Sequence, residues 1–243
     1  MFAEGLMEFE GEFLIKDVPL NEERRLSIDD AFLYLQELFG TEIMLKKPML
    51  TIDDPIFKTQ LKDKFDLINL AHTISTIMDL DPAQIKIDFF TSNENYSAAG
   101  LYHGKMNDGR YKISLLENIY LDLEKSIATI AHELAHIKLL GEERIEENSE
   151  ELTDIVPLLF GFGIFNANAV FKFTGNNSER SWSTSQLGYL SQADWGYLFA
   201  LYRYVTVDKE PEWLNYLNKT TAKDSQLAYD FIVKNPDKVL QQL

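Results

Sequence analysis

The chain has 243 residues, of which 45% are hydrophobic, and this is enough for one sizeable core or for a core with a smaller lobe attached. Its 39 acidic and 23 basic residues give a formal net charge of −16, which disfavours binding to nucleic-acid phosphates or to an anionic membrane. The absence of cysteine excludes disulfides, thiolate metal ligands and cysteine nucleophiles, so any metal must be held by nitrogen and oxygen.

The N-terminal residues do not resemble an export signal. Glu4 and Glu8 stand where a secretory signal needs a basic start and an uninterrupted apolar run. The apolar stretch at 155–165 is too short, and too interrupted by glycine and proline, to span a bilayer. We therefore expect a cytoplasmic protein without a membrane partner.

The first part of the chain, residues 1–50, is predicted to form a strand and helix region ahead of the main domain at 51–243. Apolar residues alternate with glutamate over 7–15, which is the period of a half-buried strand. Ser27 with an acidic residue three positions on resembles a capping box, so a helix is expected to begin there and to stop at Gly40.

A short strand is expected at 41–45 and a long helix after it. Asp54 followed by Pro55 is typical of a helix start, and this helix is predicted to run to about Met78. Asp81 and the proline after it would then break the chain.

The following residues predict a small sheet. A strand is expected at 85–90, and two extended segments at 98–103 and 110–115 flank a turn that contains Asp108-Gly109, which favours a hairpin. The fold class is therefore α+β, with a small mixed or antiparallel sheet.

Helices are expected in the rest of the chain. The apolar spacing predicts a helix at 121–140, and a second helix is predicted to begin near Ser149 and to continue into 161–165. A helical C-terminal tail should follow, with helices at 191–205, 211–217 and 222–233.

The chemistry of the chain is concentrated on the helix at 121–140. His132-Glu133-Leu134-Ala135-His136 is an H-E-x-x-H sequence, and residues four apart on a helix lie close enough in register for both imidazoles to reach one metal ion. Glu133 points about 100° away from His132, so it stays off the metal. It is placed instead to act as general base toward a zinc-activated water.

Zinc hydrolysis requires a third protein ligand, and the next acidic helix offers it. Glu150 and Asp154 are four residues apart and share a helix face, so Glu150 can bind the metal while Asp154 accepts a hydrogen bond from a ligand histidine. Glu151 is the competing third ligand.

These residues carry a resemblance to a known family. His132-Glu-Leu-Ala-His136 with Glu150 and Asp154 resembles the gluzincin zinc peptidases, in which a second helix supplies a glutamate ligand and an aspartate partner. The chain also looks like the compact ImmA/IrrE type of bacterial metallopeptidase and like other bacterial H-E-x-x-H proteins. The resemblance implies a zincin-like fold, Zn²⁺ as cofactor, and a peptide or protein as substrate.

Amide hydrolysis also needs a group that stabilises the oxyanion. Tyrosine and histidine are the usual types, and the side chains available are Tyr102, Tyr111, His103 and Tyr189. We take Tyr189 and His103 as the candidates. The extended region at 98–115 is expected to bind peptide by strand addition.

Two other classes of protein compete with the peptidase hypothesis. A di-iron carboxylate bundle also uses Glu-x-x-His, but it needs two copies, and only Glu133-x-x-His136 is present. The stronger alternative is a non-catalytic zincin-like interaction protein that binds a partner through its acidic surface. Glu133 argues against this alternative, because a purely structural zinc site needs no general base.

Overall fold

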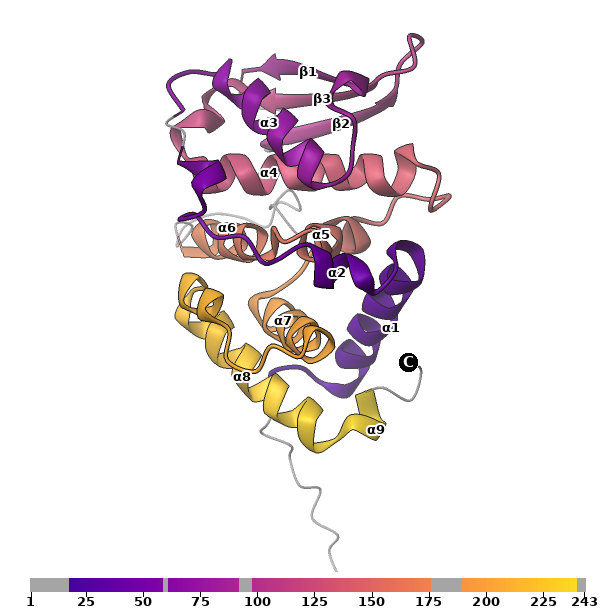
Figure 1. Ribbon diagram of the computed structural model, residues 1–243, viewed down its shortest axis with the longest axis vertical. Coiled ribbons are helices and arrows are strands. Elements are labelled where there is room, and N and C mark those ends of the chain that lie inside the picture. The colour runs from indigo at the N-terminus through magenta and orange to yellow at the C-terminus, as the bar shows by residue number, and fades with distance from the viewer. Residues whose placement is uncertain (1–17, 59–60, 92–97, 176–188, 240–243) are drawn as a thin grey trace, which may run out of the picture.

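The computed structural model describes residues 18–58, 61–91, 98–175 and 189–239, and it is mostly helical (Figure 1). The helices are α1 Glu22–Phe39, α2 Glu42–Lys46, α3 Asp66–Ile77, α4 Leu123–His136, α5 Glu150–Leu159, α6 Gly163–Gly175, α7 Gln192–Thr206, α8 Lys219–Lys234 and α9 Pro236–Val239. The sheet lies at one end, α4 runs beside it, and α5 and α6 lie on the other side of α4 (Figure 1). Among the described residues, no helix is long and apolar enough to cross a membrane.

The sheet is small and mixed. Its strands are β1 Ile85–Phe90, β2 Gly100–Lys105 and β3 Tyr111–Leu116, in the order β1-β3-β2. β1 is parallel to β3, and β2 pairs with β3 as an antiparallel hairpin whose turn contains Gly109 at a φ of 86°. The three predicted strands, the hairpin and the α+β class are thereby confirmed, and β2 is the strand nearest to α4 (Figure 1).

Helix α4 is the buried centre of the fold. Asp122 caps its N-terminus by accepting the N–H of Lys125, and one π-helical turn, Ile137–Gly141, follows His136. Five of its apolar side chains are fully buried between the sheet and α3 on one side and α5 and α6 on the other. They are Ile127, Ile130, Ala131, Leu134 and Ala135. A helix packed on both sides holds its polar side chains in fixed positions.

The first helices differ from the predictions. Asn21 accepts the N–H of Arg24 at 2.8 Å, so α1 begins before Ser27, and only the predicted stop at Gly40 is confirmed. The strand expected at 41–45 is wrong, because this segment forms α2. Its Met44 is buried and α2 packs on α7, a tertiary contact that a five-residue pattern does not reveal.

The long helix predicted from Asp54 to Met78 is also wrong. Only one 3₁₀ turn, Pro55–Phe57, follows Asp54, and α3 begins at Asp66. Phe57 inserts against two aromatic rings of the α5–α6 region, with ring centroids 6.4 and 5.3 Å away. The Asp66 carboxylate accepts the N–H of Lys62 at 2.7 Å, a side-chain bond that competes with helical pairing.

Helix α5 does not continue into 161–165 as predicted. Gly161 has a φ of 91°, and its carbonyl accepts the N–H of Leu50 at 2.8 Å. A Cβ at Gly161 would lie 2.3 Å from the carbonyl oxygen of Pro48. The chain therefore breaks here and α6 starts anew.

Two of the three predicted C-terminal α-helices are present. α7 and α8 confirm the helices expected at 191–205 and 222–233, whereas the segment at 211–217 forms a 3₁₀ stretch, Glu212–Tyr216. α1 packs on both α5 and α7, and the boundary near residue 50 stays a prediction. The strand expected at 7–15 lies outside the described residues.

Candidate metal centre

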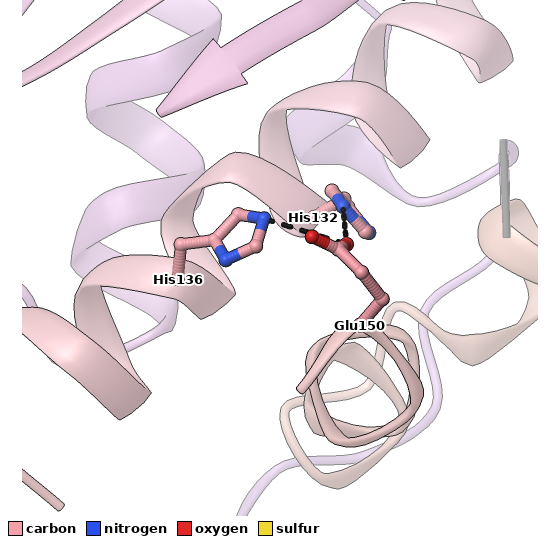
Figure 2. Close-up of side chains that lie close together, drawn as sticks. All are labelled: His132, His136 and Glu150. Atoms are coloured by element: carbon pink, nitrogen blue, oxygen red, sulfur yellow. Dashed lines mark ion pairs between the residues drawn. The ribbon is translucent and has the colours of Figure 1, made fainter. Parts of the chain in front are cut away.

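Helix α4 presents two histidines toward α5. His132 and His136 are one turn apart, and their rings meet edge to face with centroids 5.0 Å apart at an angle of 88°. Both rings are largely buried, with side-chain exposures of 14% and 9%. Figure 2 shows the two imidazoles on either side of the Glu150 carboxylate.

Glu150 comes from the first turn of α5. Its Oε2 lies 3.4 Å from His132 Nε2 and 3.7 Å from His136 Nε2 (Figure 2). One ligand atom from each of the three residues lies within 4.8 Å of the other two. The structure thus brings together two imidazole nitrogens and one carboxylate oxygen at a single point.

This geometry is suited to a bound metal ion. Four-coordinate zinc with bonds of about 2.0–2.1 Å places neighbouring ligand atoms about 3.3–3.5 Å apart. The two distances to Glu150 Oε2, 3.4 and 3.7 Å, are close to that spacing. Two histidines and one glutamate also form a donor set that leaves a fourth position open, as in catalytic zinc sites.

The other ring nitrogen of each histidine faces a side chain of α5. His132 Nδ1 lies 2.9 Å from Asp154 Oδ1, and His136 Nδ1 lies 3.5 Å from Thr153 Oγ1. Thr153 donates its hydroxyl hydrogen to the carbonyl of Ser149 at 2.8 Å, so its oxygen is free to accept. Both contacts favour a hydrogen on Nδ1, so Nε2 is the nitrogen of each ring that a metal would bind, replacing the Nε2 proton that His132 shares with Glu150 when no metal is present.

The structure distinguishes the two candidate glutamates. Glu150 Oε1 accepts a hydrogen bond from Asn148 Nδ2 at 2.7 Å, which leaves Oε2 turned toward the histidines. Glu151 Oε1 instead forms an ion pair with Arg24 at 2.6 Å. Glu150 is therefore the glutamate that belongs to the cluster.

Glu133 lies on the side of α4 that faces β2. It is 5% exposed, and a Cβ built on Gly100 would lie 2.6 Å from its Oε1. Burial raises the pKa of Glu133 to about 7, although the His132 charge and a backbone hydrogen bond from Tyr102 oppose the shift. A general base works best when its pKa is close to the working pH.

Tyr102 and Gly100 join β2 to the site. The Tyr102 ring is stacked on the His136 ring, with centroids 5.6 Å apart and planes 6° apart. Gly100 provides the space for the Glu133 carboxylate. Sequence reasoning did not single out Gly100, Asn148 or Thr153, although Thr153 lies three residues after Glu150 and thus on the same helix face.

The electrostatics of the cluster favour a cation. Burial would lower the pKa of His132, but hydrogen bonds to Asp154 and Glu150 outweigh it and raise the pKa to about 10. Burial and the neighbouring His132 charge lower the pKa of His136 to about 4. The hydrogen bond from His132 lowers the pKa of Glu150 to about 2. With Glu133 included, three carboxylates surround two imidazoles, an excess of negative charge that a divalent ion would balance.

The two oxyanion candidates, His103 and Tyr189, are not part of the group formed by His132, His136 and Glu150. His103 is exposed on β2, next to Tyr102 in the strand, and its Nε2 lies 2.8 Å from Ser114 Oγ. The Tyr189 residue is 72% exposed. Its backbone N–H, however, donates to Asp154 Oδ2 at 2.6 Å, so Tyr189 is linked to the site through its main chain.

Comparison with known proteins finds no relative of this chain. No protein-family model, no curated protein and no solved structure matches the chain. The expected resemblance to gluzincins therefore rests on the sequence of residues 132–154, and the structure adds a His132, His136 and Glu150 group that could hold a metal ion.

Proposed function

We propose that this protein is a zinc-dependent hydrolase, and specifically a metallopeptidase of the gluzincin type with a zincin-like catalytic domain. The observation that carries the proposal is the convergence of His132 Nε2, His136 Nε2 and Glu150 Oε2 beside the buried carboxylate of Glu133. His132, His136 and Glu150 would hold the metal. When bound, zinc polarises a carbonyl group and lowers the pKa of a water molecule.

The protein side chains supply the remaining chemistry. Asp154 and Thr153 hold the two imidazoles in one tautomer and orientation. Glu133 accepts a proton from the water that attacks the amide carbonyl carbon. It then delivers that proton to the nitrogen as the C–N bond breaks, so the products are a carboxylic acid and an amine.

The edge of the sheet supports a peptide as substrate. Ala99 O accepts the N–H of Leu116 at 2.9 Å, so the alternate residues Gly100 and Tyr102 direct their backbone groups away from β3. The Tyr102 N–H donates to Glu133, so a peptide would pair with the other backbone groups of these residues. β2 is an edge strand among the described residues, and it lies beside α4. An extended peptide added to this edge would pass close to Glu133.

Glu133 also favours an enzyme over an interaction protein that only carries a metal. Its carboxylate is buried, its pKa is raised to about 7, and it is not among the three residues whose ligand atoms converge. Burying a carboxylate that does not hold the metal is costly. General-base catalysis provides a reason for that cost.

The test combines metal content with cleavage of a mixed peptide library. Wild-type protein should bind about one zinc per chain, His132→Ala should lose both zinc and cleavage, and Glu133→Gln should keep zinc and lose cleavage. His72→Ala is the matched control, because His72 lies on α3 and is not among the residues whose ligand atoms converge. Wild-type protein that binds no zinc after reconstitution, or a Glu133→Gln variant that cleaves normally, would overturn the proposal.

A further inference from the structure

Arg24, in the first turn of α1, connects three helices at one point. Its Nη1 lies 2.6 Å from Glu151 Oε1 on α5. Its Nε and Nη2 lie 2.9 and 3.2 Å from the two oxygens of Asp194 on α7. Arg24 is far from the metal cluster in sequence, and nothing in the H-E-x-x-H motif predicts a role for it.

The two partners of Arg24 differ in exposure. The Glu151 side chain is 29% exposed, and an ion pair of that kind alone stabilises little. The Asp194 side chain is 5% exposed. It also accepts the N–H of Ser191 at 2.7 Å within the capping box of α7. Two parallel bonds from a guanidinium to a buried carboxylate define both distance and orientation.

The contact between Arg24 and Glu151 connects the Arg24–Asp194 pair to the metal site. Glu151 follows Glu150 directly in the first turn of α5, where helices fray most easily. A second contact ties the same helix to the chain before α7, because Asp154 Oδ2 accepts the N–H of Tyr189 at 2.6 Å. The position of the Glu150 carboxylate therefore depends on how α5 is held against α1 and α7.

We propose that Arg24 is a positioning residue of the metal site, which sets the first turn of α5 so that Glu150, and not Glu151, faces the two histidines. Arg24 forms an ion pair with Glu151 and so holds the Glu151 carboxylate beside a positive charge. Without Arg24, Glu151 is free to turn, and the negative charges at the start of α5 repel one another more strongly. The inference rests on the proposed metal site, and it extends that site to the N-terminal helix.

The test compares Arg24→Ala and Arg24→Lys with Arg110→Ala. Arg110 is a matched control because it also forms two bonds to one carboxylate, that of Asp108, but in the exposed hairpin turn. Zinc affinity, measured by chelator competition, should fall about tenfold in Arg24→Ala, the lower end of the range for residues that orient metal ligands. The loss should be smaller in Arg24→Lys, which keeps the charge without the fork, and absent in Arg110→Ala.

Hydrogen exchange gives a readout that needs no metal. In metal-free protein, the amide hydrogens of 152–154 should exchange about fivefold faster in Arg24→Ala than in wild type, while those of α8 keep their rate. This hydrogen-exchange measurement does not involve zinc, so its result tests the role of Arg24 even if the proposed function is wrong.

A double substitution then tests whether Arg24 acts on the metal site through Glu151. If Arg24 acts by holding Glu151, adding Glu151→Ala to Arg24→Ala should recover most of the lost zinc affinity, because the freed carboxylate is then absent. The proposal is overturned if Arg24→Ala matches Arg110→Ala in both zinc affinity and exchange. It is also overturned if exchange rises equally in α5, α7 and α8, because that pattern shows a general loss of stability.

Discussion

Two buried polar clusters in this molecule look alike at first and behave differently. In the cluster between α1 and α7, Asp29 receives the Arg25 guanidinium on one oxygen and the Tyr197 hydroxyl on the other, both at 2.7 Å. Each carboxylate oxygen already has a donor, so Asp29 offers little to a ligand. In the cluster between α4 and α5, the atoms that face one another, two imidazole Nε2 atoms and one carboxylate oxygen, are all able to bind a metal.

The comparison shows which feature identifies a site. Burial raises the pKa of Asp29 to about 6, and burial together with the Asp29 charge raises the pKa of Tyr197. Shifted pKa values therefore occur in both clusters and do not separate them. The distinguishing feature is that several lone pairs converge on one point while the other atoms of the same side chains are held by neighbours.

The largest expected effect separates holding a metal from using it. Glu133→Gln keeps the shape of the side chain but removes its basicity, so peptide cleavage should fall about 10³-fold while zinc content stays at the wild-type level. Steady-state kinetics and metal analysis on the same samples check this. Loss of zinc in Glu133→Gln would instead place Glu133 among the metal ligands.

The cluster of Asp29, Arg25 and Tyr197 should respond to pH only through the free energy of unfolding. The pKa of Asp29 is raised to about 6 from the ordinary aspartate value of 3.8, so between these values the folded chain binds more protons than the unfolded chain. The contribution of Asp29 to stability should therefore fall as pH rises from about 4 to 6, by up to about 3 kcal/mol.

Urea unfolding of wild type and Asp29→Asn across this pH range isolates that contribution. The wild type should lose stability relative to the variant as pH rises, and zinc affinity should be the same in both proteins. A stability difference that is constant from pH 4 to 6 would show that Asp29 is not buried as described.

The two histidines should depend unequally on their α5 partners. Asp154→Asn replaces the carboxylate 2.9 Å from His132 Nδ1, and zinc affinity should fall about 10- to 100-fold. Thr153→Val removes a longer contact of 3.5 Å to His136, so the loss should be only a few fold. Chelator competition measures both. Equal losses would mean that Asp154 has no special role in orienting His132.

The smallest expected effect concerns the space beside Glu133. Gly100→Ala places a methyl group 2.6 Å from Glu133 Oε1 and 2.7 Å from Thr129 Cγ2. It should destabilise the fold by about 1–2 kcal/mol and lower cleavage without loss of zinc.

Combining Gly100→Ala with Glu133→Ala and Thr129→Ser removes both clashing groups, so it is the control for this prediction. The destabilisation caused by Gly100→Ala should largely disappear in that background. If it persists unchanged, the strand and not the carboxylate requires glycine.

Local periodicity explains what the sequence could predict. His132 and His136 lie on one helix, as do Glu150 and Asp154, and a four-residue spacing predicts a shared face without knowledge of the fold. The hairpin followed from its turn residues for the same reason. The strand at 41–45 and the long helix from Asp54 were wrong because distant contacts, such as Phe57 against the α5–α6 region, override local preference.

The residues that sequence reasoning missed depend on packing between elements. Gly100 matters only because β2 approaches Glu133 closely, and Arg24 only because α1 meets α5 and α7. The choice between Glu150 and Glu151 likewise needed the structure, since the two are adjacent and chemically identical.

X-ray absorption at the zinc edge of reconstituted protein tests the metal centre most directly. The spectrum should require two imidazoles and oxygen ligands at about 2.0–2.1 Å, and His136→Ala should reduce the imidazole count to one. A spectrum with no imidazole ligands, or one that is unchanged in His136→Ala, would contradict the metal centre described here.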